Sequence, residues 1–247
     1  MGKIEKPRRE LHNIEILLQA LMIYKKHFME LITPLLISSI ATDLIFSFAF
    51  IHLPITIQMP TEYTSNIFVS RIKAFFVIML LVTLASWILN MAAGGVVVRY
   101  ISDLFEERSL SLTSVFKTVV KRLPTLLAAS IISGLLIAIG FMILIVPGII
   151  FSIMFFLFIP AIIIDGEGVI SSLKKSRKLV TKRWMKTFGL MLILTILIWI
   201  ASFIGGFISG VIQSFLGSSV SFVNFLLSSI ISALIAPIYF ISLTLYY

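Results

Sequence analysis

The fold is decided by residues 174–200, KKSRKLVTKRWMKTFGLMLILTILIWI, where a short basic segment runs directly into a long apolar one. The junction follows Lys182-Arg183, and similar junctions follow Lys25-Lys26 and Lys121-Arg122. Basic side chains stay with phosphates and water, whereas the residues after them need hydrocarbon. Each pair therefore marks a point where a helix lying on a membrane surface turns into the membrane.

Composition and charge support a membrane location. The chain is 59% hydrophobic and 13% charged, with a mean hydropathy of +1.11. That leaves too little polar surface to cover a water-soluble globule. The net charge of +9 is clustered, because eighteen of the twenty Lys and Arg fall within residues 3–26, 99–122 and 174–186. This clustering is typical of cytoplasmic segments rather than of nucleic-acid binding, so we expect a cell-membrane protein with both termini in the cytoplasm.

Long apolar stretches predict six membrane-spanning helices, since one span needs about 20 apolar residues. We expect an outside loop over residues 54–70 and tight turns at Pro147-Gly148 and at residues 217–219. The spans cover residues 31–53 and 74–98, two parts of the uncharged stretch 124–164 and two parts of the uncharged stretch 187–247. The predicted fold is therefore an all-α polytopic membrane protein.

Three amphipathic segments precede the spans and are too short and too polar to cross a membrane. Apolar residues recur at helical spacing in each of them, with basic residues away from the apolar stripe. The stripes are Ile14, Leu17, Leu18, Leu21 and Met22; Leu112, Val115, Phe116, Val119 and Val120; and Val169, Leu173, Val180 and Trp184. We predict three cytoplasmic interfacial helices.

The recurrence of this pattern has two readings. The chain is one membrane domain, 1–247, in which residues 11–98, 110–164 and 168–247 form three parallel repeats related by an axis along the membrane normal. Alternatively, the positive-inside rule alone places a basic pair at each inward-facing junction. Both readings stay open at the level of the sequence.

Basic residues of the interfacial helices are the candidate site for lipids and partner proteins. A basic residue near an anionic surface contributes about 1 kcal/mol, so the third segment would adhere to anionic headgroups. Topogenic charge without a binding role is the alternative. A specific site would lie between Lys121-Arg122 and Lys182-Arg183, with Trp184 as an interfacial anchor. The candidate lipid- and partner-binding residues are Lys25, Lys26, Lys121, Arg122, Lys174, Lys178, Lys182, Arg183 and Trp184.

Polar residues within the spans suggest a second function. Asp43 is the one acidic residue deep in a predicted span, where a charge costs at least about 2.5 kcal/mol. Together with Asn90 and Asn224 it could line a path for a small solute or an ion. The alternative is close helix packing with a few hydrogen bonds between helices.

The sequence contains no pattern that predicts an enzyme. Cysteine is absent, and His12, His27 and His52 lack metal-ligand spacing. No nucleophile, base or metal cluster converges, so we expect no catalytic residue, metal or cofactor. The leading expectation is a non-enzymatic membrane protein that contacts or organises anionic lipids and partner proteins, and a transporter or channel around Asp43 is the alternative.

A combination of motifs resembles a known group of membrane domains. The motifs are Leu144–Ile150 (LIVPGII), Phe158–Ala161 (FIPA), Asp165–Gly168 (DGEG) and Ser172–Val180 (SLKKSRKLV) before Trp184. This combination resembles the membrane domain associated with glycerophosphodiester phosphodiesterases and related stand-alone multi-pass proteins of undefined function. The resemblance implies a helical membrane domain that works beside enzymes or transporters. It transfers no activity, because the catalytic part of those enzymes is a separate soluble domain.

Overall fold

The computed structural model describes residues 12–52, 65–106, 111–216 and 221–247, and the regular structure of these residues is entirely helical. The helices are α1 (Asn13–Lys26), α2 (Phe28–His52), α3 (Ser65–Phe105), α4 (Leu112–Ile143), α5 (Ile145–Met154), α6 (Phe158–Ile163), α7 (Val169–Lys182), α8 (Trp184–Leu216) and α9 (Ser221–Tyr246). The predicted fold class, an all-α polytopic membrane protein, is confirmed.

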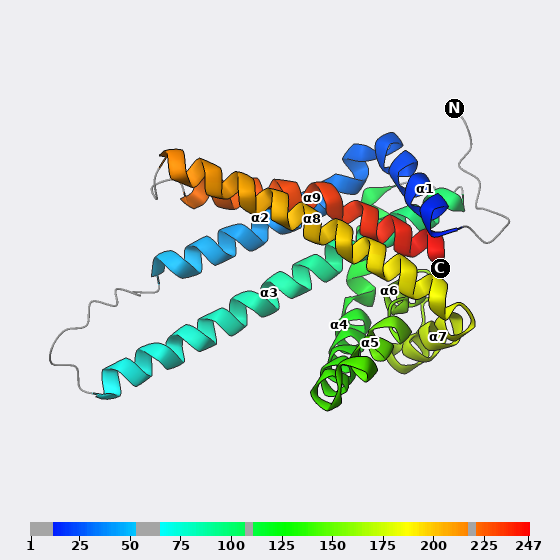
Figure 1. The fold of residues 1–247 in the computed structure, drawn as a ribbon, viewed down its shortest axis with the longest axis horizontal. Helices are drawn as coiled ribbons and strands as arrows, with labels where there is room; N and C mark the ends of the chain where they lie inside the picture. Colours follow the sequence, from blue (N-terminus) through cyan, green and yellow to red (C-terminus); the bar gives the residue numbers. More distant parts are fainter. Residues whose placement is uncertain (1–11, 53–64, 107–110, 217–220) are drawn as a thin grey trace.

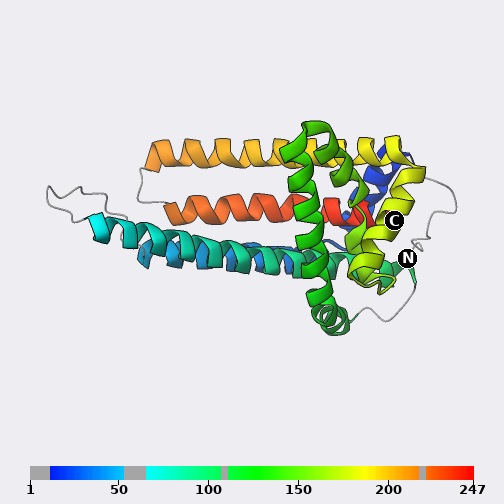
Figure 2. The ribbon, with the colours of Figure 1, turned by 90° about the horizontal axis from the view of Figure 1, so that it is seen from below.

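Four long helices form the main body of the protein. α2, α3, α8 and α9 extend along the long axis, and α9 lies between α8 and the α2–α3 pair (Figures 1 and 2). α1 packs against α9 at the end of the body where α7 also lies. The Asn13 side chain joins α1 to α8 by donating to the Lys186 carbonyl oxygen over 3.1 Å.

Helices α4 and α5 form a hairpin with a different direction. The hairpin runs across the four long helices rather than alongside them, and both views agree on this (Figures 1 and 2). α6 returns from the hairpin into the body, where it packs against α3, α4 and α7. The chain thus returns through α6 to the end of the body where α7 begins.

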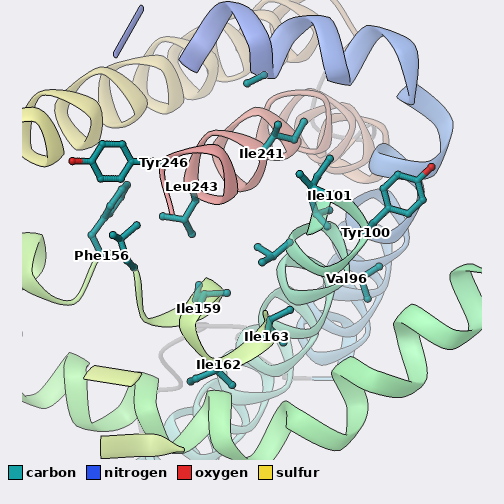
Figure 3. Close-up of a cluster of buried hydrophobic side chains, with 14 of the residues drawn as sticks. Val96, Tyr100, Ile101, Phe156, Ile159, Ile162, Ile163, Ile241, Leu243 and Tyr246 are labelled. Atoms are coloured by element: carbon teal, nitrogen blue, oxygen red, sulfur yellow. The ribbon is translucent and has the colours of Figure 1, made fainter. Parts of the chain in front are cut away.

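The buried core is concentrated at the end of the body that carries α1 and α7. There the final turns of α3, all of α6 and the end of α9 meet (Figure 3). Ile101, Ile162 and Ile241 are each 0% exposed. At mid-length of α8, by contrast, Trp199 is 74% exposed, and near its end Phe215 is 83% exposed. A large apolar surface of this kind needs a hydrocarbon environment.

Six helical segments are long and apolar enough to cross a membrane, as the sequence predicts. They are Phe28–Ala49, Ser70–Phe105, Leu112–Ile143, Ile145–Ile163, Trp184–Ile212 and Ser229–Tyr246. α3 already begins at Ser65, so the predicted outside loop over 54–70 is too long at its C-terminal end, and its first part lies outside the described residues. The predicted turn at 217–219 also lies outside the described residues.

The helices at the first and third predicted interfacial segments end where the basic pairs predict. α1 ends at Lys26 and α2 begins at Phe28, while α7 ends at Lys182 and α8 begins at Trp184. The predicted second interfacial helix, by contrast, is not separate, because α4 continues through Pro124 to Ile143. Its first turns pack inward through buried Val115 and Val119, and the same helix runs on into the apolar part.

The predicted turn at Pro147-Gly148 is wrong by three residues. The chain reverses at Leu144, which has an extended backbone with φ −162° and ψ 157°. Pro147 instead lies in the first turn of α5, where a missing N–H breaks no helical hydrogen bond. Gly148 faces Gly140 across the hairpin, because a Cβ on Gly140 would lie 2.9 Å from the Gly148 Cα atom. The two glycines therefore allow close packing of α4 on α5.

The predicted apolar stripe of α1 faces outward except at Leu17, which packs against the core. Ile14, Leu18, Leu21 and Met22 are 62%, 55%, 47% and 64% exposed. α1 instead packs against the body through another apolar set, Ile16, Ala20 and Ile23. The helix therefore has one apolar side against the protein and another that is exposed. The threefold repeat stays a prediction; of its three interfacial segments, the first and third are separate helices.

Candidate functional site

The loop between α6 and α7 is the polar centre of the end that carries the basic residues. It contains Asp165-Gly166-Glu167-Gly168, and Gly166 has a φ of +70°, which glycine adopts readily. The Arg122 Nη1 atom on α4 donates to the Gly166 carbonyl oxygen over 3.0 Å. A Cβ at Gly166 would lie 2.6 Å from the Arg122 Nη2 atom. Arg122 therefore holds the loop in place and needs glycine beside it.

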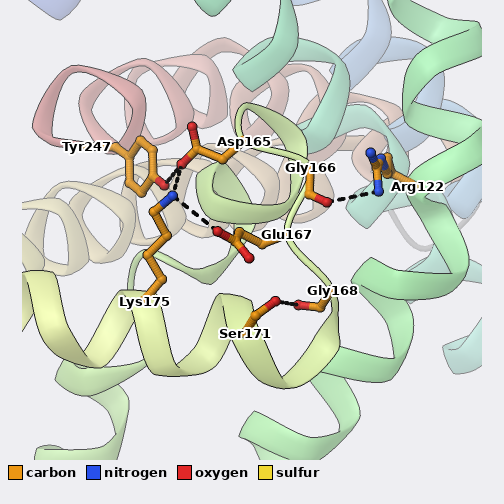
Figure 4. Close-up of polar contacts among 8 residues, drawn as sticks. All are labelled: Arg122, Asp165, Gly166, Glu167, Gly168, Ser171, Lys175 and Tyr247. Carbon is orange, nitrogen blue, oxygen red and sulfur yellow. Dashed lines mark hydrogen bonds and ion pairs between the residues drawn. The ribbon is translucent and has the colours of Figure 1, made fainter.

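Lys175 of α7 is held by both acids of this loop. Its Nζ atom lies 2.6 Å from Asp165 Oδ2 and 3.3 Å from Glu167 Oε1 (Figure 4). The Tyr247 hydroxyl donates to the same Asp165 oxygen. The hydrogen bond to Asp165 raises the pKa of Lys175 well above its usual range. Hydrogen bonds from Ser171 and then Lys175 lower the pKa of Glu167. The cluster therefore stays charged at neutral pH and joins the start of α7 to the end of the chain.

The stability of this cluster depends on pH in a predictable direction. Lys175 has a raised pKa in the folded protein, so its contribution is complete below its unfolded pKa of about 10.4 and is lost as the pH rises above that value. We expect the thermal midpoint of the wild type to fall as the pH rises above about 10.4, and that of Lys175→Met to fall less. Thermal unfolding in detergent at a series of pH values measures this. Parallel curves for the two proteins would contradict the prediction.

The inner face of α7 is fixed against the body by a buried serine. Ser176 is 0% exposed, donates to the Met154 carbonyl oxygen over 2.7 Å and accepts from the Leu157 N–H over 3.0 Å. These bonds satisfy backbone groups at the break between α5 and α6. Buried Leu173 and Val180 complete this face. The orientation of α7 is therefore determined, and its basic side is turned outward.

The outward side of α7 borders a shallow groove of about 480 Å³, which we call the α7 groove. Lys174, Lys178 and Lys182 recur at every fourth residue, which places them along one side of a helix. All three are exposed, and none has an acidic partner among the described residues. The groove is lined by Glu167, Ser171, Lys174, Lys175, Lys178, Leu179 and Lys182. It can therefore accept a negatively charged group.

The other predicted basic residues lie outside the α7 groove. Arg122 contacts the Gly166 carbonyl instead, and Lys25, Lys26, Lys121 and Arg183 are exposed elsewhere. Trp184 is half-buried at the start of α8 and packs against the core. The structure thus brings together three of the nine predicted binding residues, Lys174, Lys178 and Lys182. It adds Lys175 and its acidic partners, a pairing that the sequence pattern does not predict although the two acids precede the basic helix.

The three predicted intramembrane polar residues do not form one group. Asp43 is 9% exposed, and its Oδ2 atom has no hydrogen-bond partner among the described residues. The hydroxyls of Ser38 and Thr42 on the same helix are likewise buried without a partner in this part of the chain. Asn90 is exposed and donates to the Ser86 carbonyl oxygen of its own helix over 2.8 Å. Asn224 lies on α9, and its side chain is outside the described residues.

The helices and apolar surface define the class of the protein, an all-α polytopic membrane protein. Within the described ranges, no group of three or more His, Asp or Glu residues could hold a metal ion. The chain belongs to the family described as domain of unknown function DUF7847, whose profile matches residues 17–247. No curated protein and no solved structure matches the chain.

Proposed function

We propose that this protein is a non-enzymatic membrane protein that binds anionic lipid headgroups in the α7 groove and thereby organises lipids and partner proteins. The observation that carries the proposal is the row Lys174, Lys178 and Lys182. Three cations without acidic partners in the described chain attract phosphate groups, and each contributes about 1 kcal/mol near an anionic surface. Lys175, by contrast, is already neutralised by Asp165 and Glu167.

Apolar neighbours of the groove support a position at the membrane surface. Ile170, one turn before Lys174, is 63% exposed, and Met185, just after the end of α7, is 78% exposed. A helix with exposed apolar and basic residues at its ends fits the boundary between headgroups and acyl chains. The outward-facing apolar residues of α1 also fit the boundary between headgroups and acyl chains. We place this face in the cytoplasm and the protein in the cell membrane, because the positive charges gather there.

The proposed role as a module beside other proteins rests on the resemblance to membrane domains associated with glycerophosphodiester phosphodiesterases. The motif Asp165–Gly168 forms the loop that holds α7, and Ser172–Val180 forms most of α7 itself. In this proposal the resembling residues therefore position the groove, and a partner protein would supply any enzymatic or transport activity.

Lipid enrichment in nanodiscs tests the proposed function. The protein is reconstituted in an equal mixture of anionic and zwitterionic lipids, and the lipids retained with it are measured by mass spectrometry. We expect enrichment of the anionic lipid at 0.05 M salt and a marked decrease at 1 M salt, because the Debye length falls to about 3 Å. Equal retention of the two lipids at low salt would contradict the proposal.

A second candidate function, passage of an ion or small solute, is favoured by one observation, the unpartnered buried Oδ2 atom of Asp43. A buried carboxylate without a hydrogen bond is costly, and an ion or a proton would satisfy it. Flux of monovalent cations and protons into proteoliposomes tests this candidate. Flux that Asp43→Asn abolishes and Asn90→Ala leaves unchanged would support it, whereas the same flux in wild type and Asp43→Asn would exclude Asp43 from the path.

A further inference from the structure

The second arm of the α4–α5 hairpin, after the bend, is not one continuous helix. The apolar segment Ile145–Ile163 is long enough to cross a membrane, but it consists of α5 with 10 residues, a turn and α6 with 6 residues. At 1.5 Å per residue, α5 is about 15 Å long. The hydrocarbon core of a bilayer is about 30 Å thick. α5 therefore reaches about half the distance that a spanning helix covers.

The direction of the hairpin, and not the length of α4, argues against a crossing, because α4 has 32 residues and at about 48 Å is long enough to span a membrane. The hairpin lies nearer to α7 than to the far ends of α3 and α8, and it runs across the axes of the long helices (Figures 1 and 2). α6 fixes its base at that end, because residues 159–163 are all buried in the core. If α2, α3, α8 and α9 cross the membrane, α4 and α5 cannot also lie along its normal.

The bend of the hairpin is apolar and exposed on all sides. Met142, Ile143, Leu144, Ile145 and Val146 are 86%, 67%, 66%, 70% and 65% exposed. No charged residue occurs between Pro124 and Ile164. Lys121 and Arg122 lie just before this apolar part. The charges at the base thus fit the headgroup level, and the uncharged remainder of the hairpin, which runs across the long helices, fits the acyl chains of the same leaflet.

We propose that α4–α5 is a hairpin inserted in one leaflet, which enters the membrane from the face that carries α7 and returns to the same face. Its partner is the acyl-chain region of that leaflet. Four helices, α2, α3, α8 and α9, then cross the membrane, while α4 and the α5–α6 segment do not. The hairpin occupies lateral space in a single leaflet and holds the loop of Asp165–Gly168 and the α7 groove at headgroup level.

Single cysteines test this proposal, because the chain contains none of its own. Leu144→Cys reports the bend and, being 66% exposed, removes little packing; Val146→Cys is an independent second probe. Lys73→Cys, near the start of α3, marks the end of the long helices opposite α7; Lys174→Cys marks the α7 face, and Trp199→Cys marks the middle of α8. Each variant is labelled with an impermeant maleimide from either side of oriented vesicles, and its spin-labelled form is tested for access to oxygen and to a water-soluble nickel complex.

We expect that Leu144→Cys is labelled from neither side and that its ratio of oxygen to nickel access is close to that of Trp199→Cys. Labelling from the side where Lys73→Cys reacts, or a ratio as low as that of Lys73→Cys, would show that the hairpin crosses the membrane and would overturn the proposal. Labelling from the side where Lys174→Cys reacts would show that the bend stands in water and would overturn it too.

Discussion

Replacing Lys174, Lys178 and Lys182 together by Gln should abolish most of the enrichment of anionic lipid around the protein. Each lysine contributes about 1 kcal/mol near an anionic surface, so the triple change removes up to about 3 kcal/mol, or on the order of 100-fold in the preference for anionic over zwitterionic lipid. The fold should be retained, because these side chains are exposed and the packing of α7 depends on Leu173, Ser176 and Val180. Lipid retention measured by mass spectrometry gives the ratio.

A matched control separates a groove from general surface charge. Lys25, Lys26 and Lys121 are also exposed, and none of them lines the α7 groove. The triple change of these three to Gln alters the net charge by the same amount. We expect it to leave most of the enrichment in place. If the two triple variants lose equal enrichment, the basic residues act as topogenic charge and the groove has no special role.

The second large effect is expected at Gly140 in the hairpin. A Cβ at this position would lie 2.8 Å from the Phe151 ring and 2.9 Å from the Gly148 Cα and N atoms. Because backbone atoms cannot move aside as a flexible side chain can, Gly140→Val should cost about 3 kcal/mol, the upper end of the usual range for overpacking. We expect a lower thermal midpoint in detergent and faster proteolysis between α4 and α6.

Gly134 provides the control on the same helix. A Cβ at Gly134 would meet nothing within 4 Å. Gly134→Val should therefore change the thermal midpoint little, since the cost of valine in a helix is below that of glycine. A loss of stability in Gly134→Val equal to that in Gly140→Val would mean that helix propensity or lipid contact, and not packing of the hairpin, determines the result.

Span lengths and basic pairs predict the ends of α1, α2, α7 and α8 to within a few residues, because charge and hydrophobicity decide what leaves water. Charge and hydrophobicity do not predict the direction in which each apolar helix runs. Residues 124–164 are uniformly apolar, so their composition does not reveal the reversal at Leu144 or the break between α5 and α6. Those features depend on contacts between helices, such as Gly140 with Gly148 and Ser176 with the Met154 carbonyl oxygen.

The candidate site is likewise predicted in part by local sequence and in part determined by contacts between helices. The spacing of Lys174, Lys178 and Lys182 predicts that they share a helix face, and the structure places them along one groove. The pairing of Lys175 with Asp165 and Glu167 requires the turn at Gly166, which brings acids eight and ten residues earlier in the chain back to α7. The role of Arg122 depends on the packing of α4 beside this loop, which no local pattern indicates.

Photo-crosslinking of a bound lipid tests the central claim most directly. An anionic lipid with a photoactivatable group at its headgroup is mixed into nanodiscs with the wild-type protein, irradiated, and its attachment sites are mapped by mass spectrometry. The proposed groove predicts that the crosslinks concentrate between Ser171 and Lys182, with few near Lys25, Lys26 or Lys121. Crosslinks spread evenly over all exposed basic segments would contradict the claim that α7 carries a lipid site.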